Sequence, residues 1–97
     1  MTSYLMKVLH LTLKRKWFDA IASGMKGVEF RARSSYWDKR LLGREYDEVH
    51  FRNGYTLDRP FMRVEFKEIV SERYFHNIIL GKVIEVKYEP DAMYKGR

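Results

Sequence analysis

Residues 24–31 read GMKGVEFR, and they separate a helical pattern from a strand pattern. In the residues before them the apolar side chains recur at helical spacing, and Gly24 suits the end of a helix. After Gly27, apolar and charged residues alternate, as in a strand with one buried face. The stretch therefore predicts a helix over residues 14–23 followed by a strand over residues 28–33.

The same two patterns predict which side chains face the core. In the helix, the apolar stripe expected to pack against the rest of the protein consists of Trp17, Phe18 and Ile21. In the strand, the side chains expected to face inward are Val28, Phe30 and Ala32. The side chains expected to face outward are Glu29, Arg31 and Arg33.

The remaining elements are predicted by working outward from this stretch. A strand covers residues 6–13, with Leu9, Leu11 and Leu13 on one face and His10 and Thr12 on the other. A short helix follows Arg33, with Ser35 as its N-cap, Asp38 three residues later, Trp37 and Leu41 on one face, and Gly43 at its end. Three further strands are expected at residues 48–52, 61–68 and 81–88, with a turn at Asn53-Gly54 and an ambiguous segment at 71–80.

This order of elements predicts an α+β fold, a small barrel of about five strands with the 14–23 helix packed at its mouth. Short strands close readily into a barrel, because closure removes exposed sheet edges. The chain of 97 residues is long enough for one domain, which we place at residues 1–97 with its core at 6–88. The tail 90–97 has no periodic pattern and is expected to fray.

Composition excludes several classes of function. The chain has no cysteine, and its three histidines lack metal-ligand spacing, so we expect no metal and no cofactor. We find no Ser-His-Asp arrangement and no glycine-rich phosphate loop. A net charge of +6 favours polyanionic partners. Because no apolar run approaches the ~20 residues of a membrane span and no signal peptide is recognisable, we expect a cytoplasmic protein without membrane contact.

Read as G-x-K-x-x-E-x-R, residues 24–31 resemble the signature of the ASCH family, and the resemblance extends from about Val8 to Tyr88. It implies a PUA-like barrel and RNA binding. Some members of the family are similar to amidohydrolases that deacetylate N4-acetylcytidine, and others are linked to ribonuclease activity. In the amidohydrolase branch the motif lysine acts with a threonine three positions later. Lys26 matches that lysine, but Glu29 replaces the threonine, so only Lys26 carries over.

The motif also makes chemical sense by itself. In a partly buried cleft, Lys26 and Glu29 would form a proton-transfer pair, and Arg31 would bind a phosphate or carbonyl oxygen. Strict alternation separates Lys26 from Glu29, so we expect a bulge at Gly27 to bring them together. On the opposite wall of this cleft we place further ligand-binding residues, namely Arg52, Asn53 and Tyr55, with Arg40 at the short helix. The alternative is a solvated strand face carrying a weak ion pair.

Three functions remain open from the sequence. The first is binding of RNA, a nucleoside or a nucleotide in a basic cleft. The second is a small metal-independent hydrolase acting on a modified nucleoside or on RNA through Lys26 and Glu29. The third is a protein-interaction module. The sequence does not specify the oligomeric state.

Overall fold

The computed structural model describes residues 5–54 and 59–88, and these form five strands and two helices. The elements in chain order are β1 (Val8–Thr12), α1 (Arg15–Ala22), β2 (Val28–Ala32), α2 (Ser35–Leu41), β3 (Glu48–Arg52), β4 (Phe61–Ser71) and β5 (Phe75–Lys87). Tyr55 and the expected frayed tail at 90–97 lie outside the described residues.

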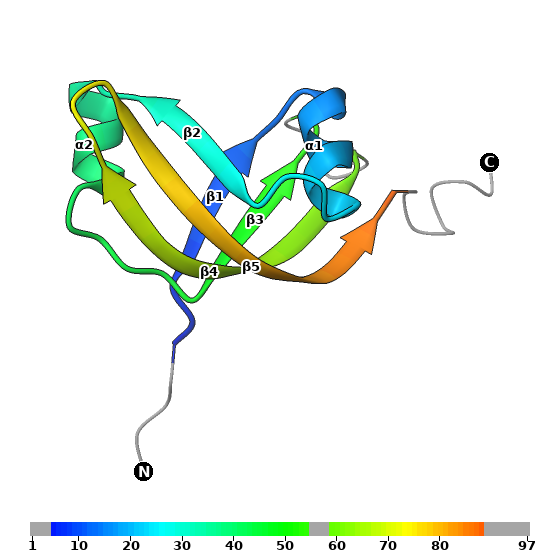
Figure 1. Cartoon of the computed structure of the whole chain (residues 1–97). Helices are drawn as coiled ribbons and strands as arrows, with labels where there is room; N and C mark the ends of the chain where they lie inside the picture. Colours follow the sequence, from blue (N-terminus) through cyan, green and yellow to red (C-terminus); the bar gives the residue numbers. More distant parts are fainter. Residues whose placement is uncertain (1–4, 55–58, 89–97) are drawn as a thin grey trace, which may run out of the picture.

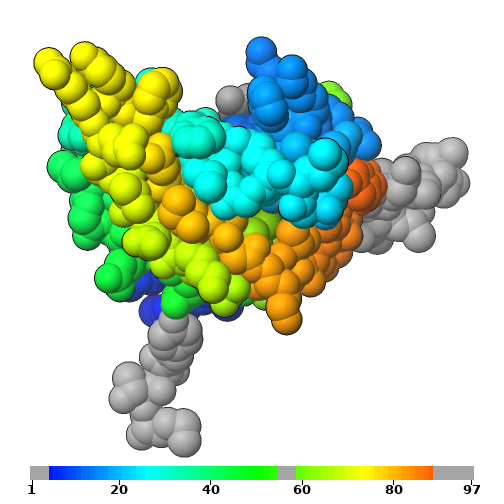
Figure 2. All heavy atoms as spheres, in the orientation of Figure 1, coloured from blue at the N-terminus to red at the C-terminus, as the bar shows by residue number. Residues whose placement is uncertain are grey.

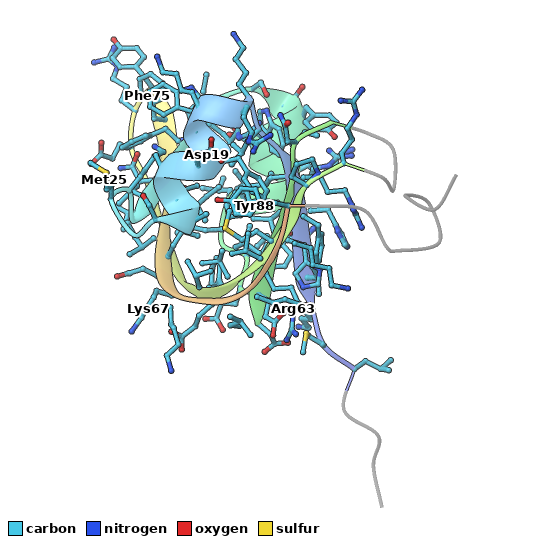
Figure 3. All side chains as sticks on the ribbon, turned by 90° about the vertical axis from the view of Figure 1, so that its right-hand side faces the viewer. Asp19, Met25, Arg63, Lys67, Phe75 and Tyr88 are labelled. Carbon is cyan, nitrogen blue, oxygen red and sulfur yellow. The ribbon has the colours of Figure 1, made fainter. Side chains whose placement is uncertain are left out.

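All five strands belong to one sheet with the order β1-β3-β4-β5-β2. The pair β1–β3 is parallel and the other pairs are antiparallel. The long strands β4 and β5 curve strongly, which gives the sheet the shape of a half-barrel (Figures 1 and 3). Register shifts between β4 and β5 lie at this curve, and such irregularities bend strands.

The sheet is less closed than we expected from the sequence. In the described part of the chain, β1 and β2 are edges that do not pair with each other. A side chain crosses the seam instead, because the Arg31 guanidinium donates a hydrogen bond of 3.0 Å to the Thr12 carbonyl oxygen. The α+β class, the five strands and the two helices are confirmed, while the predicted full closure is replaced by a side-chain bridge.

The two helices lie at opposite ends of the curled sheet (Figure 1). Helix α1 follows the end of β1 and packs beside β2, as Figure 2 also shows. Helix α2 is capped by Ser34, whose hydroxyl accepts from the Trp37 amide at 3.1 Å, so the prediction of Ser35 as the cap is wrong by one residue. Neither helix in the described residues is long and apolar enough to cross a membrane.

One apolar core fills the concave side of the sheet. Its members come from both helices and from all strands except β2, and they are Leu9, Leu11, Leu13, Phe18, Ile21, Leu41, Val49, Phe51, Met62, Val64, Ile78 and Leu80. The leucine face predicted for the first strand is confirmed. Two of the three helix residues are also confirmed, but Trp17 is wrong because its side chain is 43% exposed.

Strand β2 faces the opposite way from our prediction. Glu29 is buried and Phe30 is 51% exposed, although alternation alone suggested the reverse. The inward polar positions are tolerated because Glu29 forms ion pairs with neighbouring cations and Arg31 reaches a backbone carbonyl. The ambiguous segment 71–80 becomes the end of β4, a turn and the first half of β5, so both strands are longer than predicted.

Candidate functional site

Three side chains of the GxKxxExR motif meet in one cluster at the end of the half-barrel near α1. Lys26 Nζ lies 3.6 Å from Glu29 Oε1, and Arg31 Nη2 lies 3.1 Å from Glu29 Oε2. The side chains are 10–20% exposed, so the cluster is largely withdrawn from water. Both oxygens of the carboxylate are therefore engaged by cations, and we call this group the motif cluster.

The backbone before β2 orients Lys26 without a bulge. The Lys26 amide donates to the Ala20 carbonyl at 3.1 Å, which ties the loop to the end of α1. The Gly27 carbonyl accepts from the Leu80 amide at 2.9 Å and continues the regular β2–β5 ladder. The predicted bulge at Gly27 is therefore wrong. A loop that begins with Gly24 at φ +85° turns Lys26 toward Glu29.

Arg31 is the most constrained member of the motif cluster. Besides Glu29 and the Thr12 carbonyl, it contacts the Trp37 ring, whose centroid lies 5.1 Å from the guanidinium carbon. Its Nε is buried, and no acceptor in the described chain reaches that atom. Arg31 therefore has one unsatisfied donor at the site. A buried donor without a partner costs about 1–3 kcal/mol of stability.

The parallel pairing of β1 and β3 brings a second predicted residue close to the motif cluster. Both strands end at the same edge of the sheet, where the Asn53 amide nitrogen donates to the Leu13 carbonyl at 3.0 Å. Arg31 and Asn53 thus bind consecutive carbonyls where β1 ends. The Asn53 amide holds backbone here, which is a structural contact independent of any ligand.

Arg52 lies apart from the motif cluster, on the outward face of β3. It lines a cavity of about 310 Å³ together with His10, Thr12, Tyr36 and His50, and we call this cavity the outer pocket. The structure therefore groups Lys26, Glu29 and Arg31 in one place and puts Arg52 in another. Tyr55, the remaining residue expected on that wall, lies outside the described residues.

Arg40 reaches the rim of the outer pocket through Tyr36. Its guanidinium carbon lies 3.5 Å from the centroid of the Tyr36 ring, and its Nη1 donates to the Tyr36 carbonyl at 2.9 Å. The Tyr36 ring is 55% exposed, so this cation–π pair is accessible from solvent. Arg52 therefore lines the outer pocket directly, whereas Arg40 contacts it through Tyr36.

The charged groups behind the outer pocket are tightly organised. Glu48 accepts two hydrogen bonds from Arg63, at 2.9 and 2.8 Å, and lies 2.9 Å from His50 Nε2. The Arg63 hydrogen bonds, more than that of His50, lower the pKa of Glu48 to about 2. Figure 3 shows Arg63 at the lower right of the molecule, far from Phe75 and Met25 at the upper left.

The two histidines of the outer pocket face each other at right angles. The ring centroids of His10 and His50 are 5.5 Å apart with an interplanar angle of 87°. The pKa of His10 is lowered by partial burial and, to a smaller extent, by His50 and Arg52. The sequence placed His10 on the polar face of its strand, but only the parallel β1–β3 register sets it opposite His50.

A Ser-His-Asp contact, which the sequence did not suggest, links α2 to the β4–β5 hairpin. Ser71 Oγ lies 2.7 Å from His76 Nδ1, and His76 Nε2 lies 2.7 Å from Asp38 Oδ1. The His76 ring is fully buried, and Asp38 is also held by two hydrogen bonds from Arg33. Every partner is satisfied within the fold, so this network has the character of a structural staple.

The geometry must carry the argument for function. No protein-family model, curated protein or solved structure matches the chain. Among residues 5–54 and 59–88, no three side chains of His, Cys, Asp or Glu are grouped so as to hold a metal ion.

Proposed function

We propose that this chain is an ASCH-type, PUA-like domain that binds RNA or a nucleoside at the motif cluster. The observation that carries the proposal is Arg31, which is fixed by Glu29 and the Thr12 carbonyl yet keeps a buried Nε donor without an acceptor. That atom is buried, so a base or ribose oxygen would bind it only after the Arg31 side chain turns outward. The motif resemblance and the net charge of +6 support the same ligand class.

Exposed aromatic rings beside the motif cluster add a surface for stacking. Lys26 Nζ lies 4.9 Å from the Phe30 ring centroid and 5.4 Å from that of Trp17, and Lys16 lies 4.6 Å from the Trp17 ring. Phe30 and Trp17 are about half exposed, which is unusual for large apolar rings. Aromatic rings paired with cations are the surface on which single-stranded nucleic acids stack their bases.

A small hydrolase is the second candidate, and it rests on the Lys26–Glu29 pair. The two groups are 3.6 Å apart and less than 20% exposed, which suits a proton-transfer pair in a modified-nucleoside deacetylase or a ribonuclease. The second oxygen of Glu29 is occupied by Arg31, however. The carboxylate is therefore committed to holding cations, and for this reason we place binding before catalysis.

The test of binding compares two arginine variants of equal charge. We expect Arg31→Gln to weaken the affinity for a fluorescent single-stranded RNA by about 5- to 150-fold, the effect of losing one charge-assisted contact of about 1–3 kcal/mol. Arg73→Gln removes an exposed arginine from the β4–β5 turn and should change the affinity little. Affinity should fall with salt by a log-log slope of about −0.7 per phosphate. Absence of binding at low salt, or equal effects of both variants, would refute the proposal.

The hydrolase candidate is tested with the wild type and Lys26→Ala. Incubation with N4-acetylcytidine or single-stranded RNA would release acetate or shorter fragments if Lys26 takes part in turnover. The variant should then lose turnover while circular dichroism shows an intact fold. RNA binding by the wild type without either product would leave binding as the function.

A further inference from the structure

The outer pocket is built by the register of the parallel strands. His10 pairs directly with His50 and Thr12 with Arg52, so these side chains are neighbours on one face of β1 and β3. The alternate residues of both strands fill the core on the other face. Tyr36 of α2 lies against this outward face, and the open pocket between them has a volume of about 310 Å³. The volume accommodates a phosphate group together with part of what is attached to it.

The charges in the outer pocket are unbalanced. The Arg52 guanidinium carbon lies 4.5 Å from the Phe61 ring centroid, and no carboxylate within the described chain forms an ion pair with it. Glu48 lies on the same face of β3, four residues before Arg52, but its two oxygens are already bound by Arg63 and His50. No carboxylate is among the described residues that line the cavity.

The other half-buried arginines of the described chain have acidic partners. Arg33 pairs with Asp38, Arg63 with Glu48, and Arg31 with Glu29. Arg52 differs from these three in having no acidic partner within the described residues. It stands beside His10, whose ring nitrogens form no hydrogen bond in the described chain, and beside His50, whose Nε2 is bound to Glu48. An arginine held in place by a ring, with its fork free, binds a phosphate through two parallel N–H donors.

We propose that the outer pocket binds a phosphate group between the Arg52 guanidinium and the rings of His10 and His50. The site lies outside the motif cluster, and the inference does not depend on the function proposed above. The phosphate would belong either to the RNA backbone as a diester or to a free nucleotide as a monoester. Both present the same oxygens to Arg52, and the experiment below separates them.

Binding should be coupled to a proton on His10. The groups that face His10 are His50 and Arg52 from β3 and Tyr36 from α2, with Glu48 and Arg63 behind His50. In the free protein the pKa of His10 is lowered, so the ring is neutral at pH 7. A bound anion favours the protonated ring and raises that pKa. Phosphate binding should therefore take up a proton, and affinity for a diester of constant charge should rise as pH falls from 7.5 to 6, a range we choose to bracket the ordinary histidine pKa of about 6.5.

The experiment is calorimetric titration with inorganic phosphate, followed by histidine NMR. We expect saturable binding by the wild type, with shifts of the His10 and His50 ring signals. Arg52→Gln should weaken binding about tenfold or more. The matched control is Arg73→Gln, because Arg73 also lies over a ring, at 5.4 Å from the Tyr74 centroid, but on the β4–β5 turn. His10→Gln should reduce the proton uptake, measured in buffers of different ionisation enthalpy, by the share that the His10 ring contributes.

Uridine, uridine monophosphate and the dinucleotide UpU identify the source of the phosphate. Binding of UpU with loss at Arg52→Gln supports an RNA backbone, and binding of the monophosphate alone supports a free nucleotide. Failure of the wild type to bind phosphate, equal weakening by Arg73→Gln, or unchanged histidine signals would overturn the proposal. If Arg31→Gln still binds phosphate, the outer pocket is distinct from the motif cluster. A negative result for the motif cluster in the RNA assay would therefore not affect the phosphate result.

Discussion

His76 and His10 occupy two opposite kinds of environment in one small domain. The His76 ring is fully buried, and both of its nitrogens are engaged, by Ser71 and by Asp38. His10 is exposed at the edge of the outer pocket, and neither ring nitrogen hydrogen-bonds within the part of the chain that the structure describes. The contrast indicates that one histidine holds elements together while the other is free to meet a ligand.

The residues around His76 and His10 show the same contrast as the two rings. Around His76, Arg33 binds Asp38 at 2.7 and 3.1 Å and the Glu72 carbonyl at 2.9 Å, so α2 is fastened to the β4–β5 hairpin. Around His10, the Arg52 guanidinium disfavours a proton on the ring, and no carboxylate is among the described residues that line the pocket. A saturated network stabilises a fold, whereas an unsaturated one favours binding of an opposite charge.

The largest expected effect is loss of stability on replacing the buried ring. We expect His76→Ala to lower the free energy of unfolding by about 3 kcal/mol, because it leaves a cavity and removes a partner from both Ser71 and Asp38. His10→Ala should cost less than about 1 kcal/mol. Urea denaturation at pH 7 measures both values. Similar losses in the two variants would contradict the division between the two histidines.

A smaller effect is expected on acidification. Hydrogen bonds from Arg63 lower the pKa of Glu48 to about 2 from the ordinary value of 4.5, so its contribution is complete above pH 4.5 and is lost as pH falls toward 2. Asp38, whose pKa is lowered chiefly by Arg33, acts in the same direction. In urea denaturation, Glu48→Gln should lose less stability than the wild type when the pH is lowered from about 5 to about 2. This window spans the ordinary and the lowered pKa of Glu48. Glu45→Gln, which removes an exposed carboxylate, is the control and should leave the slope unchanged.

The smallest effect on stability is expected at Arg52. Because no carboxylate of the described chain pairs with this guanidinium, Arg52→Gln should change the free energy of unfolding by no more than about 0.5 kcal/mol. The same variant should weaken phosphate binding, which gives a loss of binding without a loss of fold. A large destabilisation would show that Arg52 stabilises the fold as Arg33 does, and it would contradict the contrast between the two arginines.

Local patterns predicted much of the fold. The leucine alternation in β1 and the apolar stripe of α1 were readable because each repeats within a few residues, and β3 has the predicted bounds of Glu48–Arg52. The orientation of β2 was not readable. Its inward Glu29 and Arg31 depend on each other and on the Thr12 carbonyl, and the seam that brings that carbonyl near exists only in three dimensions.

Part of the candidate site was predictable from the sequence, and part of it was not. Lys26, Glu29 and Arg31 were predictable as a group because they lie within six residues of one another in the sequence. The outer pocket was not, because His10 and His50 become neighbours only when β1 and β3 pair in parallel. The Asp38–His76–Ser71 network likewise joins three elements, and the residues between β4 and β5 carried no pattern that distinguished a strand from a loop.

The order of the strands in the sheet has a consequence for the kinetics of folding. Strand β2 is synthesised early, but its hydrogen-bonding partner is β5, the last strand of the described residues. Strand β1 likewise pairs with β3 and not with a neighbour in sequence. The chain loses conformational entropy when it closes such long loops, before strand pairing stabilises the structure. This cost slows folding relative to a fold built of local hairpins. During synthesis, β2 therefore has no strand to pair with until Phe75–Lys87 has left the ribosome.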